Sequence, residues 1–252
     1  MLFVSRLFSR WLIFLKGVVF LQKLNLDPRL SCVASFVRKG SRVADIGTDH
    51  AYIPVYLLQK GISPSAIAAD LRKMPLKNAE RTVEQFSLSN SIELVLSDGL
   101  DEIDKDSCDD IIIAGMGGIS ILEIISRIDW ILDGRYRLIF QPMSHQEYVR
   151  RFLFENGFEI VGEKCCLDSK HCYCVIAAEY TGRIRKHTPA EIYTGTLYKD
   201  ADENAKIYLR KQLFRLEKRR DALKDAITGP EEVEKLSAIV EDFKRLTGVE
   251  EW

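Results

Sequence analysis

Two carboxylates, a glycine and a histidine fall within the six residues DIGTDH, which run from Asp45 to His50. A turn that binds a dinucleotide needs the pattern G-x-G-x-x-G, because bare backbone amides must approach a pyrophosphate at the start of a helix. Here Gly47 is the only glycine, and Asp45 and Asp49 would repel a diphosphate. These residue types instead favour a cationic ligand in a partly desolvated cleft, where carboxylates attract it.

S-adenosylmethionine has the features that such a site would bind, namely a sulfonium, an ammonium, a ribose diol and an adenine, without a phosphate. Asp70 ends the next apolar run, where a carboxylate can accept hydrogen bonds from both ribose hydroxyls. Asp98 and Gly99 end the third run, where the carboxylate can meet the adenine amino group and the glycine lets backbone come close. We therefore predict S-adenosyl-L-methionine as the cofactor, bound by Asp45, Gly47, Asp70, Asp98 and Gly99.

Each of these carboxylates also has a plainer interpretation. Asp49 could only cap the helix that follows it, because Asp is a preferred N-cap residue. Asp70 could be a surface cap before Leu71, and Asp98 could be an ordinary turn residue. Singly the signals are weak, but as an ordered set at the ends of successive strands they favour a binding site.

A run of glycines, GMGG from Gly115 to Gly118, follows the fourth apolar run. Many enzymes that methylate the adenine amino group carry an acidic or amide residue, two prolines and an aromatic residue here, and this chain does not. The glycines would instead bring backbone close to the transfer site and leave room for a flat base. A purely structural turn is the alternative. We assign Gly115 and Met116 to catalysis, and Gly115 and Gly117 to cofactor binding.

Seven apolar runs bounded by turn residues are the strands that would position these side chains. They are Arg42–Ile46, Ala66–Asp70, Ile92–Ser97, Asp110–Ala114, Leu138–Gln141, Phe158–Lys164 and Tyr173–Tyr180. Helical patterns cover Tyr52–Lys60, Pro75–Phe86, Ser120–Ser126 and Gln146–Glu155. Strands that alternate with crossover helices predict a doubly wound parallel α/β sheet, with ligands beyond the carboxyl ends of its strands. Only Asp168–Lys170 joins the last two strands, which predicts an antiparallel hairpin at the end of the sheet.

The chain changes character after Gly182. Two groups of apolar residues at helical spacing predict two antiparallel helices packed on each other. The groups are Leu209, Leu213, Leu216, Leu223 and Ile227, then Leu236, Val240, Phe243 and Leu246. Between Lys206 and Lys224 the first helix carries eight Lys or Arg residues, including Arg215, Arg219 and Arg220. This basic face is either a solvated surface paired with the acidic second helix or a ridge that contacts phosphates.

Length and composition limit the domain organisation. At 252 residues, 46% hydrophobic and a formal net charge of −1, the chain can form one globular domain and an appendage. We predict an N-terminal extension over residues 1–22, a methyltransferase domain over 24–182 and a helical domain over 183–252. The first segment is basic and apolar but interrupted by Lys16, and is too broken to predict a membrane span. It is a start assigned too far upstream, a docked amphipathic helix or an anchor; we expect no stable membrane association.

Six cysteines are spread over the chain, which is not a small secreted scaffold. This usage favours reduced thiols and a cytoplasmic protein. The cluster of Cys165, Cys166, His171, Cys172 and Cys174 suggests zinc, but Cys172 and Cys174 would share one strand face while Cys165 and Cys166 would point to opposite faces. We therefore predict small buried residues in a hairpin and no metal.

Several of these motifs together resemble the bacterial tRNA (adenine-22-N1)-methyltransferases of the TrmK family. The most specific are the Asp49-His50 pair and the GMGG run, and the resemblance extends from Leu24 to the C-terminus. The motifs that carry it are RLSCVASFV from Arg29, ADIGTDHAYIP from Ala44, the acid at Asp70, SDGL from Ser97, AGMGG from Ala114, QP at Gln141 and Pro142, and the helical C-terminal segment. It implies a class I methyltransferase core with a Rossmann-like sheet, S-adenosylmethionine as donor, tRNA as substrate, and a coiled-coil-like domain that helps hold the tRNA.

Methylation at N1 of adenine would place particular demands on the site. N1 carries an in-plane lone pair, so it needs in-line placement and exclusion of water rather than deprotonation. The ring becomes cationic, so a nearby carboxylate would stabilise the developing charge. We assign that role to Asp49, with His50 orienting it or stacking on the base; a packing histidine is the alternative for His50.

The substrate side of the site follows from the same chemistry. N1 lies on the Watson–Crick edge, so the nucleotide must be unpaired or extruded from its stack. Tyr52, Met116 and His145 could line the pocket that receives it. We assign Arg29, Tyr52, Gln141, Pro142, Arg215, Arg219 and Arg220 to substrate binding, and expect a monomer. Two other hypotheses compete: a methyltransferase acting on a small molecule or protein, and a non-catalytic RNA-binding protein with a methyltransferase fold.

Overall fold

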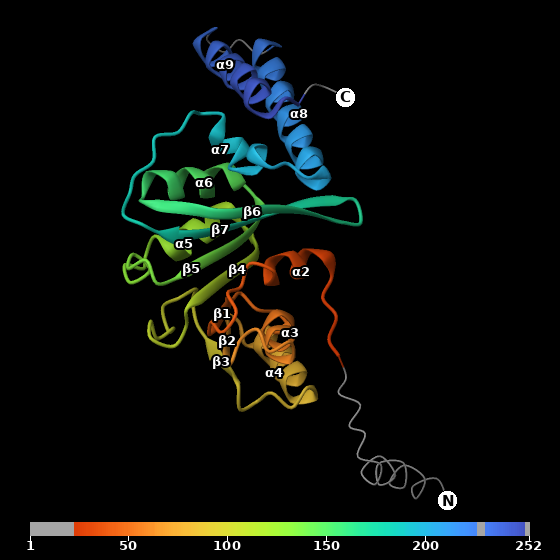
Figure 1. The fold of residues 1–252 in the computed structure, drawn as a ribbon, viewed down its shortest axis with the longest axis vertical. Coiled ribbons are helices and arrows are strands. Elements are labelled where there is room, and N and C mark those ends of the chain that lie inside the picture. Colours follow the sequence, from red (N-terminus) through yellow and green to blue (C-terminus); the bar gives the residue numbers. More distant parts are fainter. Residues whose placement is uncertain (1–22, 226–229, 250–252) are drawn as a thin grey trace, which may run out of the picture.

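A computed structural model of the chain describes residues 23–225 and 230–249 (Figure 1). The predictions for residues 1–22 and for Ile227 concern parts of the chain outside these ranges. Of the helices that lie inside the ranges, none is both long and apolar enough to cross a membrane.

A seven-stranded sheet forms the centre of the molecule, in the order β3-β2-β1-β4-β5-β7-β6 (Figure 1). The strands are β1 (Val43–Ile46), β2 (Ala66–Asp70), β3 (Ile92–Leu96), β4 (Asp110–Gly117), β5 (Arg137–Ser144), β6 (Phe158–Asp168) and β7 (His171–Tyr180). The first five strands pair in parallel, and β7 pairs antiparallel with both β5 and β6. The predicted doubly wound sheet with a terminal antiparallel hairpin is therefore confirmed.

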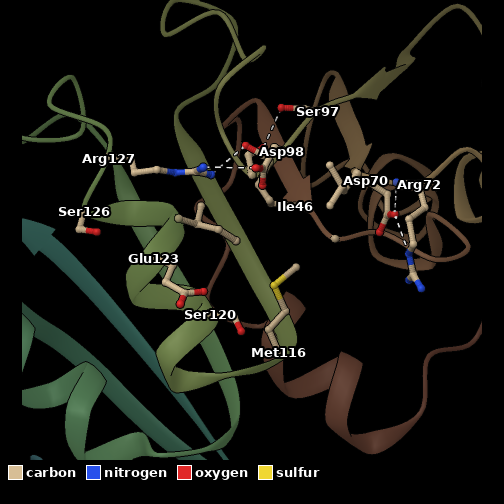
Figure 2. A pocket seen from close by; sticks show the side chains of 14 residues that line it. Ile46, Asp70, Arg72, Ser97, Asp98, Met116, Ser120, Glu123, Ser126 and Arg127 are labelled. Carbon is tan, nitrogen blue, oxygen red and sulfur yellow. Dashed lines mark hydrogen bonds and ion pairs between the residues drawn. The ribbon is translucent and has the colours of Figure 1, made fainter.

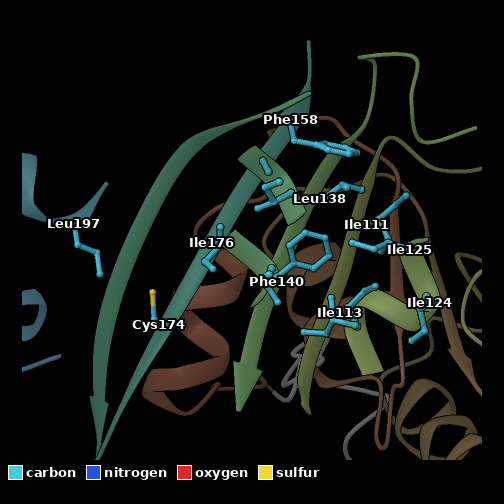
Figure 3. Close-up of a cluster of buried hydrophobic side chains, with 14 of the residues drawn as sticks. Ile111, Ile113, Ile124, Ile125, Leu138, Phe140, Phe158, Cys174, Ile176 and Leu197 are labelled. Carbon is cyan, nitrogen blue, oxygen red and sulfur yellow. The ribbon is translucent and has the colours of Figure 1, made fainter. Parts of the chain in front are cut away.

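Helices cover both faces of this sheet because successive strand residues point to opposite faces. On one face, Val43 and Ile112 of the sheet are buried against three helices. These helices are α2 (Pro28–Ala34), α3 (Tyr52–Gln59) and α4 (Lys73–Gln85). On the other face Ile111, Ile113 and Phe140 pack against α5 (Gly118–Ile125) and α6 (Gln146–Glu155), as Figure 3 shows in part. Because helices bury both faces of the sheet, its strands are almost continuously apolar rather than alternating.

Strands β4 and β5 run past the points where their apolar patterns end. The predicted ends were Ala114 and Gln141, whereas pairing continues to Gly117 and Ser144 across two register shifts. Gly115 has a φ of +82°, a conformation that glycine adopts without strain and that fits such an irregularity. Gly115 to Gly117 are therefore part of the sheet, and Gly118 begins helix α5 directly after it.

Helix α3 begins later than the interpretation of Asp49 as its cap requires. Its N-cap is Ala51, in the left-handed conformation with a φ of 53°. The backbone N–H of Ala51 donates to the Thr48 hydroxyl oxygen at 3.1 Å. The interpretation of Asp49 as the N-cap of this helix is therefore wrong, because the chain turns two residues later than the pattern suggests.

The C-terminal segment folds as α7 (Glu191–Thr194), the 3₁₀ turn η1 (Leu197–Lys199), α8 (Glu203–Asp225) and α9 (Pro230–Thr247). Helices α8 and α9 pack against each other beyond the β6 edge of the sheet (Figure 1). Six of the predicted residues are buried, Leu209, Leu213, Leu216, Leu236, Val240 and Phe243, whereas Leu223 and Leu246 are half-buried. Helix α8 also buries Ala205, Tyr208, Gln212 and Glu217, which the pattern did not predict. Lys244 and Glu217 form an ion pair of 2.8 Å between the two helices. A coiled-coil geometry for this pair stays a prediction.

A fully buried ion pair ties the start of the appendage to the sheet. Arg150 of α6 donates from Nε to Glu163 Oε1 of β6 at 2.8 Å, and neither side chain is exposed. Arg150 also donates to the Tyr193 carbonyl at 2.9 Å, and Glu163 accepts from the Thr196 hydroxyl at 2.9 Å. Buried contacts thus cross the division at residues 182 and 183, which itself stays a prediction.

Candidate active site

Two hollows open at the carboxyl ends of β1, β2 and β4, and they share Gly47. The sheet order reverses between β1 and β4, so this edge is the topological switch point, where open α/β sheets bind ligands. The larger hollow has a volume of about 680 Å³ and the smaller about 330 Å³. Both fall in the usual size range for small-molecule sites.

The larger hollow brings together Asp70, Asp98 and Gly99 (Figure 2). Asp70 is 8% exposed, and its Oδ1 accepts from the backbone N–H of Arg72 at 2.7 Å. Gly99 has a φ of +62°, and a Cβ there would lie 2.7 Å from Ile124 Cγ2. The predicted carboxylates at the ends of the second and third strands therefore line the same hollow. Gly99 lines it with backbone alone, since a side chain there would meet Ile124.

Arg127 closes one side of the larger hollow and was not among the predicted residues. Its Nη1 lies 3.2 Å from Asp98 Oδ2 (Figure 2). Its Nη2 lies 3.7 Å from Asp101 Oδ1. Both partners are more than a third exposed, so the pair is screened by water and adds little stability. Its effect is on the site, because it occupies one oxygen of the carboxylate that we assigned to adenine.

Gly47 lies between the two hollows, in a backbone conformation that favours glycine. Its φ is +77°, and a Cβ would lie 2.0 Å from Met116 Cε. The backbone N–H groups of Gly47 and Thr48 donate to the Ala69 carbonyl at 2.8 and 2.9 Å, which fixes the turn beside β2. The Met116 side chain therefore lies against bare backbone at the boundary of the two hollows.

The smaller hollow contains Asp45, Asp49, His50, Tyr52 and Gly115. Asp45 is 7% exposed, and burial raises the pKa of its carboxyl to about 6, although a hydrogen bond with Thr48 opposes the shift. A desolvated carboxylate of this kind favours a cationic ligand, since a positive charge offsets the penalty of burying the ion.

Asp49 and His50 lie at the open side of the smaller hollow. Asp49 Oδ2 is 3.3 Å from His50 Nε2, and their side chains are 68% and 39% exposed. The His50 ring stacks on Tyr52 with centroids 5.0 Å apart and an angle of 10° between planes. The arrangement leaves a carboxylate and two aromatic rings facing whatever enters from solvent.

Arg29 connects the glycine run with β5. Its Nη1 donates to Gln141 Oε1 at 2.9 Å, and a Cβ on Gly115 would lie 3.6 Å from the same nitrogen. Gln141 is fully buried and its Nε2 also contacts the Pro142 carbonyl at 3.3 Å. The three predicted residues Arg29, Gln141 and Pro142 thus come together, with Gln141 holding Arg29 in place.

Five predicted substrate residues line neither hollow, namely Gln141 and Pro142 of β5 and three arginines of the appendage. Arg215, Arg219 and Arg220 belong to α8, beyond the β6 edge, and the side chain of Arg220 pairs with Asp221 at 2.9 Å.

In the hairpin, Cys165 and Cys166 belong to the buried clusters of opposite faces, as predicted. Among residues 23–225 and 230–249, no group of three or more His, Cys, Asp or Glu side chains could hold a metal ion.

Comparisons with known proteins show what the whole chain is similar to. A family model described as a methyltransferase domain matches residues 26–176. The tRNA (adenine(22)-N(1))-methyltransferase of Bacillus subtilis is 34% identical over 193 residues, which cover 76% of this chain and 81% of that protein. The crystal structure of the B. subtilis m1A22 tRNA methyltransferase TrmK superposes with a TM-score of 0.78 at 29% identity, covering 90% and 99% of the two chains. A Streptococcus pneumoniae protein in complex with S-adenosyl-L-methionine gives a TM-score of 0.74 at 30% identity, covering 87% and 98%.

Proposed function

Because the chain belongs to the tRNA (adenine(22)-N(1))-methyltransferase family, we propose that it transfers a methyl group from S-adenosyl-L-methionine to N1 of adenine 22 in tRNA. The observation that supports this most is the turn around Gly47. One buried carboxylate, Asp45, and one exposed carboxylate, Asp49, flank a glycine that separates two hollows. A single turn thereby serves two ligands.

The residues present fit the cofactor. Asp70 would hold the ribose diol, and Asp98 and Gly99 would meet the adenine in the larger hollow. Asp45, whose pKa is raised by burial, would pair with the ammonium in the smaller hollow, next to Gly115 and near Gly117 of the glycine run. When bound, the sulfonium supplies an electrophilic methyl group. Gly47 lets the backbone approach the ligand where a side chain would meet Met116.

The target adenine of the tRNA would enter the smaller hollow beside Asp49, His50 and Tyr52. Asp49 would stabilise the positive charge that develops on the ring as N1 is methylated, and His50 orients it across 3.3 Å. Arg29, held by Gln141, would place the base over Gly115 and Met116. Alignment of the two ligands and exclusion of water are the main catalytic contributions of these residues.

The tRNA would also contact α8. Arg215 and Arg219 are exposed on this helix, in a stretch of eight basic residues between Lys206 and Lys224. Such a surface binds phosphates without reading sequence and loses affinity as salt rises. We place the protein in the cytoplasm as a monomer, since its substrate is tRNA and the proposed site is formed by one chain.

The proposal is tested with labelled cofactor and an unmodified tRNA transcript, followed by mapping of the modified nucleoside. We expect N1-methyladenosine at position 22 and no label in a transcript with guanine at that position. Label in a small molecule or a protein instead would support the first competing hypothesis. Binding of tRNA without transfer and without affinity for the cofactor would support the second. Charge reversal at Arg215 and Arg219 should reduce tRNA affinity and leave cofactor affinity unchanged.

A further inference from the structure

Two stacked histidine–tyrosine pairs lie at the ends of the strands that flank β4. The rings of His50 and Tyr52 are 5.0 Å apart at 10°, and those of His145 and Tyr148 are 5.0 Å apart at 9°. The first pair lines the smaller hollow with Gly115. The second pair follows β5. The sequence predicted His145 in the pocket for the extruded base, but it lines neither hollow, and Tyr148 has no role so far.

Backbone contacts hold the second pair beside the glycine run. Gly117 pairs with Ser144 between β4 and β5, and a Cβ on Gly118 would lie 2.4 Å from the His145 carbonyl oxygen. His145 caps α6 in the left-handed conformation, and the Tyr148 N–H donates to its carbonyl at 3.1 Å. Since β1 and β5 are the two neighbours of β4, the pairs lie on opposite sides of the glycine run.

The second pair presents an aromatic surface to solvent. The His145 side chain is 46% exposed and Tyr148 is 41% exposed. His145 Nδ1 lies 3.3 Å from Glu147 Oε1, a contact that orients the ring against Tyr148. A flat, exposed ring next to a site that takes an extruded base is the surface on which unpaired nucleotides stack in RNA-binding proteins.

Basic side chains continue from this surface toward α8. Helix α7 packs between α6 and α8, and it carries the half-buried Tyr193. Burial raises the pKa of Tyr193, and the charges of Arg219 and Arg151 act in the opposite direction, while Glu147 and Tyr148 add to it. Arg151 of α6 and Arg219 of α8 are both exposed, and α7 packs against both helices, so the two arginines lie on elements that α7 connects.

We propose that Tyr148, stacked on His145, is a stacking surface for the unpaired nucleotide next to the methylated adenine, and that the RNA backbone continues past Arg151 to Arg219. The proposal rests on the proposed function, because it takes the target base to lie at the glycine run. It connects the site of transfer with the basic helix by a single strand of RNA. The aromatic ring supplies contact area, and the two arginines supply phosphate contacts.

The test is a double-mutant cycle that measures tRNA affinity after removal of the Tyr148 ring, of one base, or of both. The parent and Tyr148→Leu are titrated with an unmodified tRNA transcript and with two transcripts that are abasic on the 5′ or the 3′ side of the target adenine. We expect Tyr148→Leu to bind the intact transcript about 5- to 150-fold more weakly, which corresponds to roughly 1–3 kcal/mol for one base–aromatic stack. The parent should bind one of the two abasic transcripts as weakly as Tyr148→Leu binds the intact transcript. Tyr148→Leu should bind that abasic transcript no more weakly than the intact one.

Controls separate stacking from other effects. Tyr148→Phe should bind as the parent does, because the ring is kept, and Tyr56→Leu of α3 should change nothing, because it lies on the other face of the sheet. Equal losses for both abasic transcripts in parent and Tyr148→Leu, or a loss in Tyr148→Phe as large as in Tyr148→Leu, would overturn the proposal. Methylation of the intact transcript by the parent is measured in parallel, so failure of the proposed function is seen separately.

Discussion

Neutralising Asp45 should remove a pH dependence that we expect for cofactor binding. The carboxyl is 7% exposed, and burial raises its pKa from an ordinary 3.8 to about 6. The ammonium of the cofactor would bind the ionised form, because a charge pair in a desolvated site needs both charges. Affinity should therefore rise as the pH passes upward through 6.

The expected magnitude follows from the fraction of protein that is ionised. With a pKa of about 6, roughly a tenth of Asp45 is ionised at pH 5 and roughly nine tenths at pH 7. The apparent dissociation constant scales inversely with the competent fraction, so it should be about tenfold higher at pH 5 than at pH 7. Asp45→Asn should bind more weakly at pH 7 and show no slope over this range.

Calorimetry at pH 5, 6 and 7, in two buffers with different ionisation enthalpies, measures both affinity and proton release. At pH 6 we expect about half a proton to leave for each cofactor bound. His50 lines the same hollow, so His50→Asn is the control, and it should keep the slope. The reasoning is refuted if the parent binds equally well at all three pH values, or if Asp45→Asn retains the slope.

The same carboxyl has a predictable effect on stability without cofactor. Its pKa is raised on folding, so the folded state holds the proton more tightly, and ionised Asp45 is destabilising above pH 6 but not below pH 4. A shift of about two units corresponds to roughly 3 kcal/mol. Asp45→Asn should raise the free energy of unfolding at pH 7 by up to that amount, and the gain should shrink as pH falls toward 4. Urea denaturation at several pH values measures this.

Three further predictions concern other parts of the molecule. Gly47→Ala should weaken cofactor binding about tenfold or more, because its Cβ would lie 2.0 Å from Met116 Cε; Gly61→Ala, which has a similar positive φ and open space around it, should not. Asp70→Ala should weaken cofactor binding by roughly 1–3 kcal/mol, and unchanged calorimetric affinity would remove it from the site. Arg150→Met should lower the free energy of unfolding by roughly 3–5 kcal/mol, because it leaves a buried carboxylate unpaired; urea denaturation would contradict this if the loss were under about 1 kcal/mol.

The sequence predicted the sheet and the grouping of Asp45, Asp70 and Asp98 for a simple reason. Parallel strands alternate with helices, so the ends of all parallel strands meet at one edge, and residues that follow apolar runs must gather there. Apolar periodicity alone located the strands to within a few residues. It failed at the ends of β4 and β5, which continue through glycine and proline, and at β6, which continues from Lys164 to Asp168, because the pairing of neighbouring strands decides where a strand ends.

The contacts that sequence reasoning missed join residues far apart in the chain. Arg127 reaches Asp98 from a loop after α5, and Arg150 reaches Glu163 from a helix to a strand. Such pairs leave no local pattern, since each partner alone reads as an ordinary charged residue. The cap of α3 was missed for a local reason: Ala51 in a left-handed conformation is rare, and no propensity rule predicts it.

The central claim is that one turn serves both ligands, Asp45 on the cofactor side and Asp49 on the base side. Single-turnover methyl transfer by Asp49→Asn, measured beside cofactor and tRNA affinities, tests it most directly. Loss of a charge that matters most in the transition state should appear in the chemical step. We predict a rate about tenfold or more below the parent, with both affinities within a few-fold. A variant that binds cofactor far more weakly but transfers at the parental rate when saturated would contradict the claim and make Asp49 a cofactor ligand.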